Sequence, residues 1–478
     1  MTQTLPAPRL AEIRPIARSV PVWFAILAAS LPMFMSTLDN LVMTNALPAI
    51  RLDLGASVEE LQWFVNAYTL SFASFILMSA ALGDRFGRRS VFVIGIVVFT
   101  LASAFSALSN DPSMLILGRA VQGLGAAAVM PLSLTLLVGS VSQRHRSLAI
   151  GIWGGVSGLG VALGPLIGGA VVEGFSWEAI FWLNVPVGMI AIPLALIALP
   201  NTFGAKLRAD VIGLVLAGVG VLALVYAIVR GNPAGWDSLE VLGSLGVGVL
   251  LLVAFIAWER RAPAPMLPLR LFRDRSFSVA NIVGLTFSFG VFGAIFILIQ
   301  FLQIVQGYSP LEAGVLTMPW TMAPMIVAPL TGLIAPRVGT RFLIVTGLLL
   351  QAIGLYWFAA TMTADVAYTA MLPAFIFAGV GMGMVFAPLS TAVLATMGPD
   401  DHAKASGTNS SVREIGVALG IAVLAAIFVA AGGQLTPTGY VDAAIPAIFT
   451  GASALALAAV VALALPSGRA SVTTPERA

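Results

Sequence analysis

Long apolar runs alternate with short polar interruptions along almost the whole chain. Each run is about 18–25 residues long, which is enough for an α-helix to cross a hydrocarbon core of roughly 30 Å. The pattern predicts an all-α membrane protein with about fourteen transmembrane helices. These spans are expected to begin near Trp23, Val58, Val91, Pro112, Ile150, Ala179, Val211, Leu239, Phe277, Leu311, Phe342, Thr369, Arg413 and Ala443.

Composition points the same way, because 59% of the 478 residues are hydrophobic and 9% are charged. A soluble domain has about 25% charged residues. The chain has no cysteine, which excludes disulfides, thiol catalysis and cysteine metal sites. The net charge of +3 comes from loops, so it does not indicate nucleic-acid binding.

The basic residues predict the orientation in the membrane. If the N-terminus lies inside, 21 of the 24 Lys and Arg fall in cytoplasmic loops, Lys404 and Arg413 among them. Only Arg51 and Arg230 fall outside, and Arg119 lies within a span. The positive-inside rule therefore predicts that both termini are cytoplasmic, with the first 20 residues retained as a polar flank.

A repeated loop indicates two related halves. Residues 80–89, after the second span, align with residues 332–341, after the tenth, at an apolar position, two arginines and a glycine. Secondary transporters are commonly built from such repeats, with the substrate site between them near the membrane midplane. The chain is therefore divided into a six-helix bundle (1–200), an inserted helix pair with a cytoplasmic linker (201–275) and a second, pseudo-symmetric six-helix bundle (276–478).

Two charged residues lie deep within predicted spans, and they are the first candidates for a functional site. A carboxylate at mid-membrane costs roughly 2.5–3.5 kcal/mol on insertion scales, so residues such as Asp39 usually line a bundle interior or a cavity. Met35 and Met43 share its helical face and would form an adaptable apolar wall. Arg119 is the only other charge at this depth. A buried acid and a buried base suggest a transporter.

Four segments resemble signature motifs of the major facilitator superfamily, and the resemblance covers about residues 20–465. Residues 38–48 are similar to the first-helix signature of the fourteen-span drug:proton antiporters, with Leu41 in place of a threonine. Residues 80–89 resemble motif A with Ala80 in place of its first glycine, 115–127 resemble motif B, and 151–169 match the antiporter motif C. Residues 176–186 resemble a further family stretch in which Glu178 replaces an arginine.

The buried carboxylate of Asp39 is the candidate proton-coupling acid, and the resemblance implies a proton-transfer role for Arg119. A carboxylate that holds either a proton or a cationic ligand gives a minimal antiport scheme, and a nearby guanidinium favours loss of the proton. The alternatives are a structural acid at the helix break near Pro48 and a structural tether for Arg119.

Motif C predicts a bent hinge between the two bundles. Small residues four apart allow close helix contact, and proline kinks a helix. Ordinary close packing is the alternative. The hinge residues are Gly151, Gly160, Gly164, Pro165, Gly168 and Gly169.

Motif A predicts a conformational latch. The resemblance implies that the start of the thirteenth helix, taken to follow the capping residues Ser410 and Ser411, lies beside Asp84, which would bind it. Positive-inside charge explains the neighbouring arginines but not the acid. The latch consists of Asp84, Arg85, Gly87 and Arg88.

The substrate cavity is expected to be lined by Met35, Asp39, Met43, Trp63 and Trp320, although the tryptophans are also suited to anchoring at the membrane interface. Helix 10 is expected to be interrupted by Pro319, Pro324 and Pro329. No second acid is predicted in the spans of the C-terminal half.

Together these features indicate a proton-coupled exporter of amphipathic or cationic drugs and dyes in the bacterial plasma membrane, which would confer antibiotic resistance. We expect a monomer without cofactor or metal. A dedicated exporter of one natural product is the alternative, and motif C disfavours uptake by symport. An enzyme is not expected because no catalytic motif is present, and a sensor is not expected because no loop exceeds about 20 residues.

Overall fold

The computed structural model describes residues 21–204, 210–398 and 401–466. Fourteen of the described helices are long and apolar enough to cross a membrane, which confirms the predicted number of spans. The cytoplasmic flank at residues 1–20, the tail at 467–478, and Lys206 and Arg208 of the linker lie outside the described residues.

Two helices of the first half begin at residues whose side chains cap them. Ser57 and Glu60 form a capping box at the start of the second helix, and Asp111 caps the fourth, which has proline at its first position. The helices are α1 (Val22–Leu54), α2 (Val58–Phe86), α3 (Arg88–Ala107), α4 (Pro112–Ser140), the short η1 (Gln143–His145), α5 (Arg146–Gly174), α6 (Ala179–Trp182) and α7 (Asn184–Ala198).

Two helices connect the halves, and the second half follows. The connecting pair is α8 (Val211–Ala234) and α9 (Leu239–Glu259). The second half contains η2 (Leu269–Arg273), α10 (Arg275–Gln300), the π-helical turn η3 (Phe301–Val305), α11 (Pro310–Leu316), α12 (Met318–Thr321), α13 (Ala323–Val338), α14 (Thr340–Thr361), α15 (Tyr368–Leu394), α16 (His402–Ala430) and α17 (Val441–Ala462).

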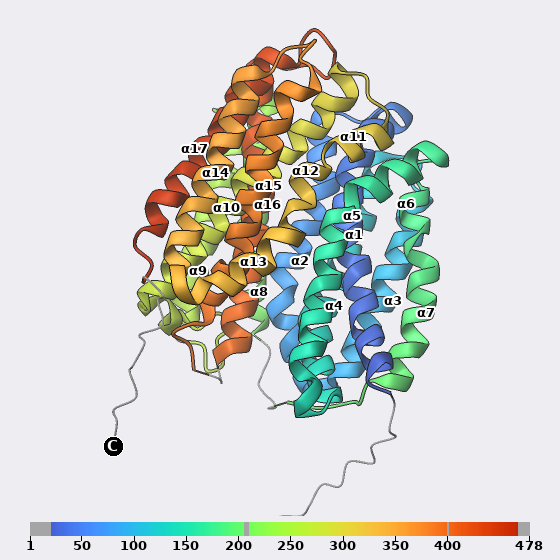
Figure 1. Ribbon diagram of the computed structural model, residues 1–478, viewed down its shortest axis with the longest axis vertical. Helices are drawn as coiled ribbons and strands as arrows, with labels where there is room; N and C mark the ends of the chain where they lie inside the picture. The colour runs from blue at the N-terminus through green and yellow to red at the C-terminus, as the bar shows by residue number, and fades with distance from the viewer. Residues whose placement is uncertain (1–20, 205–209, 399–400, 467–478) are drawn as a thin grey trace, which may run out of the picture.

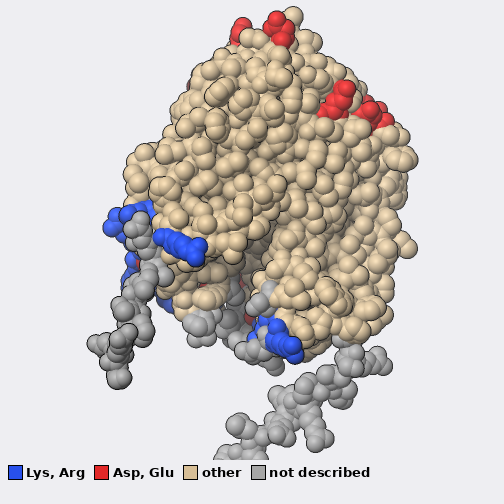
Figure 2. Space-filling view, in the orientation of Figure 1, with Lys and Arg blue, Asp and Glu red and all other residues tan. Residues whose placement is uncertain are grey.

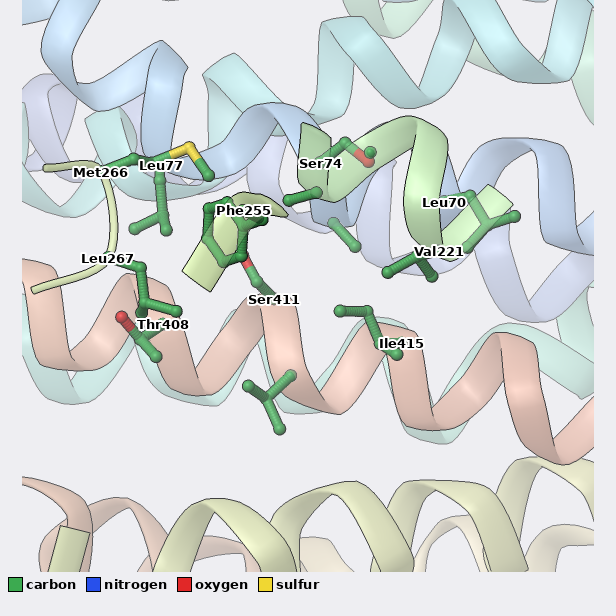
Figure 3. Close-up of a pocket in the computed structure, with 14 residues that line it drawn as sticks. Leu70, Ser74, Leu77, Val221, Phe255, Met266, Leu267, Thr408, Ser411 and Ile415 are labelled. Atoms are coloured by element: carbon green, nitrogen blue, oxygen red, sulfur yellow. The ribbon is translucent and has the colours of Figure 1, made fainter. Parts of the chain in front are cut away.

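The two halves stand side by side as helical bundles with roughly parallel axes (Figure 1). Helix α8 contacts both α2 of the first half and α16 of the second. It therefore covers a seam between the halves. At this seam Ser411 and Ile415 of α16 project towards Leu70 of α2 and Val221 of α8, around a small apolar pocket of about 90 Å³ (Figure 3).

The repeated loops have the same backbone conformation. Gly87, between α2 and α3, has φ 104°, and Gly339, between α13 and α14, has φ 98°. Each N–H bonds the carbonyl four residues earlier, so each glycine ends one helix and turns the chain into the next. Residues with a side chain rarely adopt such φ values, which explains the glycine at both sites.

Two predicted span starts were wrong, whereas the others lie within a few residues of the observed ones. The tenth span begins at Met318 rather than Leu311, because its prolines divide the segment into α11, α12 and α13. The thirteenth begins at Lys404 within α16, so Arg413 lies inside a helix and not in a loop.

Candidate functional site

The two buried charges of the first half form an ion pair. Arg119 Nη1 of α4 lies 2.5 Å from Asp39 Oδ2 of α1. Their side chains are 0% and 2% exposed, respectively. Asp39 therefore does not face lipid, and its charge is balanced within the bundle.

Two amides complete the shell around the carboxylate. Gln122 Nε2 of α4 donates to Asp39 Oδ1 over 2.8 Å, and Asn184 Nδ2 of α7 donates to the same oxygen over 2.7 Å. Both amides also bond the Ser103 hydroxyl of α3. The acid on α1 is thus held by donors from α4 and α7, which Ser103 of α3 positions in turn, and both carboxylate oxygens are satisfied.

Arg119 has further partners on α2. Its Nε donates to the Phe64 carbonyl oxygen over 3.1 Å, and its guanidinium lies 4.4 Å from the centre of the Tyr68 ring. The Tyr68 hydroxyl lies 2.9 Å from the Ser36 hydroxyl of α1. Arg119 Nη2 has no hydrogen-bond partner among the described residues. This network can keep the arginine in place when the acid releases it.

Removal of the arginine is expected to destabilise the fold strongly. Loss of one partner from a buried pair costs about 3–5 kcal/mol, because the other charge stays buried without compensation. We therefore expect Arg119→Gln to lower the thermal unfolding temperature of the detergent-purified protein. The double variant Asp39→Asn/Arg119→Gln should recover part of that loss. Strictly additive losses would show that the pair does not couple the two residues energetically.

The larger cavity lies between the halves and not around the ion pair. It has a volume of about 570 Å³ and is lined by α5, α13 and α15, including Gly151, Gly158, Pro324, Met382 and Phe386. The lining residues of α5 follow soon after Arg144 and Arg146, so the cavity lies towards the end of the molecule where lysine and arginine gather (Figure 2).

The residues predicted to line the cavity lie elsewhere. Met35 and Met43 are buried in separate apolar clusters on either side of Asp39. Trp63 packs against Tyr226 of α8, with ring centres 6.2 Å apart. Trp320 is 2% exposed and packs on Phe375, and its ring N–H has no partner among the described residues. The structure thus brings Asp39 and Arg119 together but does not gather the predicted lining residues around one described cavity.

Motif C contacts helices of both halves. Gly160, Gly164 and Gly168 of α5 lie against Phe34, Leu38, Leu41 and Val42 of α1, so this stripe joins two helices of the same bundle. A Cβ on Gly169 would collide with the Pro310 carbonyl of α11, and one on Gly314 of α11 would collide with the Pro165 carbonyl. The end of the motif therefore contacts α11 of the other half, the carbonyl of Ala162 within the motif accepts a hydrogen bond from Thr321 of α12, and Gly151 lines the cavity.

Asn45 connects the halves at this same contact, although no separate role was predicted for it. Its Nδ2 donates to the Pro165 and Pro310 carbonyls over 2.8 and 3.0 Å. Gln303, in the π-helical turn η3, donates to Asn45 Oδ1 over 2.7 Å. The signal was present, since Asn45 belongs to the first-helix signature. The two halves are therefore joined at the end remote from the basic residues.

The latch residues contact different partners from those expected. Asp84 Oδ1 accepts from Arg88 Nε over 2.7 Å, and the Asp84 carbonyl accepts from Gly204 N in the linker after α7. Ser410 and Ser411 lie inside α16, because that helix begins at His402. Their assignment as helix caps was therefore wrong. Among the described residues, Asp84 bonds Arg88 and the linker and not the start of the thirteenth span.

Loss of the Asp84 charge is expected to slow transport without preventing substrate binding. The Asp84–Arg88 pair is about one-third exposed, so Asp84→Asn should change stability by about 1 kcal/mol or less. The effect should instead appear in the initial rate of dye transport, measured beside equilibrium dye binding. An unchanged rate would remove the latch hypothesis.

A second intramembrane acid was missed. Glu414 lies within the span Lys404–Ala430, next to Arg413, so the prediction of no further acid in the C-terminal spans was wrong. A helix that begins at Arg413, as predicted, would have Glu414 in its first turn, at the membrane surface. The run of small and polar residues before Arg413 hid the true start of α16.

Comparison with known proteins identifies the fold and the family. The model of the Major Facilitator Superfamily matches residues 22–421 and 282–476. The chain belongs to the Major Facilitator Superfamily. A solved peptide transporter POT has a TM-score of 0.68 at 14% identity, covering 92% of this chain and 93% of the other. A bacterial homologue of the lysosomal transporter Spinster, in an inward-facing conformation, has a TM-score of 0.66 at 18% identity, covering 94% and 99%.

The relatives of this superfamily member include resistance exporters. The tetracenomycin C resistance and export protein of Streptomyces glaucescens is 33% identical over 428 residues, covering 89% of this chain and 79% of the relative. The multidrug resistance protein Stp of Mycobacterium tuberculosis H37Rv is 34% identical over 407 residues, covering 85% and 75%. The methylenomycin A resistance protein of Bacillus subtilis is 32% identical, covering 90% and 91%.

These findings confirm several predictions. The protein is a multi-pass membrane transporter of the drug and antibiotic efflux family, with fourteen candidate spans in the part of the chain that the structure describes, and it is not an enzyme.

Proposed function

We propose that the protein is a proton-coupled antiporter that exports amphipathic or cationic small molecules across the bacterial plasma membrane. The proposal is supported chiefly by the enclosed Asp39–Arg119 pair inside one bundle, together with a separate cavity between the two bundles. A buried carboxylate can exchange its arginine partner for a proton with little movement of the surrounding helices. The contact between α1 and α4 at this pair would then depend on whether Asp39 carries a proton.

The antiport cycle follows from this arrangement. The positive-inside rule assigns the basic end, and with it both termini, to the cytoplasm. The cavity lies towards that end and the ion pair is intact. The described state therefore suits binding of substrate from the cytoplasm, after Asp39 has released its proton. Protonation of Asp39 from the outer side would break the pair and favour the return of the empty carrier. The scheme requires one chain and no cofactor.

Proton-driven exchange is testable with liposomes that contain the purified wild-type protein. Ethidium is a suitable dye because its permanent charge prevents passive trapping by a pH gradient. With the membrane potential clamped, an inside-acid gradient should drive ethidium into the lumen as protons leave. Accumulation driven only by an inside-alkaline gradient would indicate symport, and equal uptake without a gradient would contradict proton coupling.

A dedicated exporter of one natural product is the second candidate. It is supported by the names of two relatives, which refer to resistance against tetracenomycin C and methylenomycin A. Competition by several unrelated dyes for ethidium transport would favour the broad exporter, and its absence would favour the dedicated one.

A further inference from the structure

Helix α8 of the inserted pair is bonded to both halves near its C-terminal end. Arg230 Nη1 of α8 donates to Glu59 Oε2 of α2, in the first half, over 3.2 Å. Asn232 Nδ2, two residues further along α8, donates to the Ala426 carbonyl of α16, in the second half, over 2.6 Å. One short segment of α8 therefore connects the two halves across the seam between α2 and α16.

The two ends of α8 differ in how they meet this seam. The bonded end lies beside the first turn of α2, which follows directly after α1, and the proposed cycle assigns this end to the outside. The N-terminal half of α8 instead borders the apolar pocket of about 90 Å³ through Ala217, Gly218 and Val221 (Figure 3). Helix α8 therefore closes the outer part of the seam with polar bonds and leaves a void in the inner part.

Arg230 forms more bonds with α9 than with α2. Its Nε and Nη2 donate to Glu240 of α9 over 2.7 and 3.4 Å, and the Tyr226 hydroxyl of α8 donates to the same carboxylate over 2.7 Å. Glu59 accepts a single bond from Arg230, and its side chain is 25% exposed. Water can replace a partly exposed ion pair of this kind at little cost, so Arg230 can leave Glu59 without leaving α9.

The buried packing of α8 also favours the second half. Val225 and Val229 of α8 are 0% and 4% exposed. Their apolar cluster contains two buried residues of α16, Ala418 and Ala422, but one of α2, Leu70. Together with the short bond to the α16 carbonyl, this packing fixes α8 more firmly to the second half than to the first.

We propose that the inserted helix pair is a strap that moves with the second half and holds the outer ends of the two halves together through the Arg230–Glu59 pair. Secondary transporters open by movement of one bundle against the other. Separation of the outer ends then breaks this pair, whereas α8 stays on α16. The strap thereby stabilises the described state, in which the cavity lies towards the basic end. It requires movement of the two halves but neither proton coupling nor a particular substrate.

Access of maleimide to α2 tests the strap in the purified full-length protein without any substrate. Asn66 is 0% exposed and lies one turn before Leu70, on the face of α2 that meets α8 and α16. Because the chain has no cysteine, Asn66→Cys supplies a single thiol that reacts when α2 separates from these helices. In this background, Glu59→Gln should raise the labelling rate about twofold to fivefold, since one partly exposed ion pair is lost.

The controls separate the ion pair from a general loosening of the fold. Asp237→Asn changes the charge by the same amount on the exposed turn between α8 and α9, so it should label as the Asn66→Cys background does. Glu59→Asp keeps the charge and should stay closer to the background than Glu59→Gln. Equal labelling rates in Glu59→Gln and Asp237→Asn, or a slower rate in Glu59→Gln, would overturn the strap.

Two covalent tethers test which half the strap follows. Glu59→Cys/Arg230→Cys joins α8 to the first half, and Asn232→Cys/Ala426→Cys joins it to the second, each through a short bifunctional thiol reagent that a reductant cleaves. In liposomes the first tether should stop ethidium exchange until reductant is added, because the outer ends can no longer separate. The second tether should leave most of the exchange. Exchange that continues under a complete first tether, or that stops equally under both, would overturn the proposal.

The outcomes also separate the strap from the proposed function. If the wild type exchanges protons for ethidium while Glu59→Gln labels as Asp237→Asn does, only the strap fails. If Glu59→Gln labels faster but no pH gradient drives ethidium transport, proton-coupled export fails and the strap remains.

Discussion

Replacement of Asp39 with asparagine is expected to reduce gradient-driven ethidium transport to the level of empty liposomes. The amide keeps the shape of the side chain and can still accept hydrogen bonds from Gln122 and Asn184. It cannot bind and release a proton in the working pH range. Asp39→Asn should therefore still bind ethidium and exchange it across the membrane when no gradient is present.

The control for this variant is Asp39→Glu, which restores an ionisable group and should recover part of the coupled transport. Folding is checked by size-exclusion chromatography, because the variant leaves the Arg119 charge without its carboxylate. Gradient-driven transport that survives in Asp39→Asn would rule out Asp39 as the coupling acid.

A valine at Gly169 is expected to produce the second large effect, a shift away from the described conformation. Any Cβ at this position collides with the Pro310 carbonyl of α11, where the two halves meet. Overpacking of this kind typically costs 1–3 kcal/mol, which corresponds to about a fivefold to more than hundredfold change in a conformational equilibrium. The cost falls only on states that keep α5 and α11 in contact.

The natural absence of cysteine makes this shift measurable. A cysteine introduced at Ser157, in the cavity wall, reports access from the basic end through its rate of maleimide labelling. Gly169→Val should slow this labelling and the transport of ethidium by about tenfold or more. The matched control is Gly174→Val, because an added Cβ at Gly174 meets no atom within 4 Å. Equal labelling in both variants would contradict a role for the Gly169 contact.

The helical framework was predictable because membrane spans depend on a property that is local in sequence. An apolar run of sufficient length must satisfy its backbone internally, so length and hydropathy determine most span starts. The two wrong span starts lie where hydropathy does not determine where the helix begins. Prolines divide the segment from α11 to α13, and α16 begins in the polar residues near His402, where hydropathy gives no signal.

The central ion pair was predictable as two residues but not as a contact. Charges are so rare within the spans that Asp39 and Arg119 could be singled out, yet their 80-residue separation says nothing about distance. The same is true of Asn184, which reaches Asp39 from α7. Contacts of this kind depend on how helices are rotated against one another, which a single sequence does not specify.

The cavity lining was the least predictable part of the site. Met35 and Met43 share a helical face with Asp39, but that face turns into the bundle and away from α5. Amphipathic patterns do not distinguish an inward face from a cavity face when the whole helix is apolar. Glu414 is a residue that the sequence analysis missed. The predicted start of its helix was too late, which placed this acid at the membrane surface and not within a span.

The most direct test of the coupling scheme is proton movement driven by the dye itself. Ethidium is added outside liposomes that contain the protein, a pH dye in the lumen, equal pH on both sides and a clamped membrane potential. The Asp39–Arg119 scheme predicts that the lumen becomes alkaline as ethidium enters, and that Asp39→Asn abolishes this change while ethidium exchange continues. Ethidium entry without luminal alkalinisation in the wild type, or alkalinisation that persists in Asp39→Asn, would contradict it.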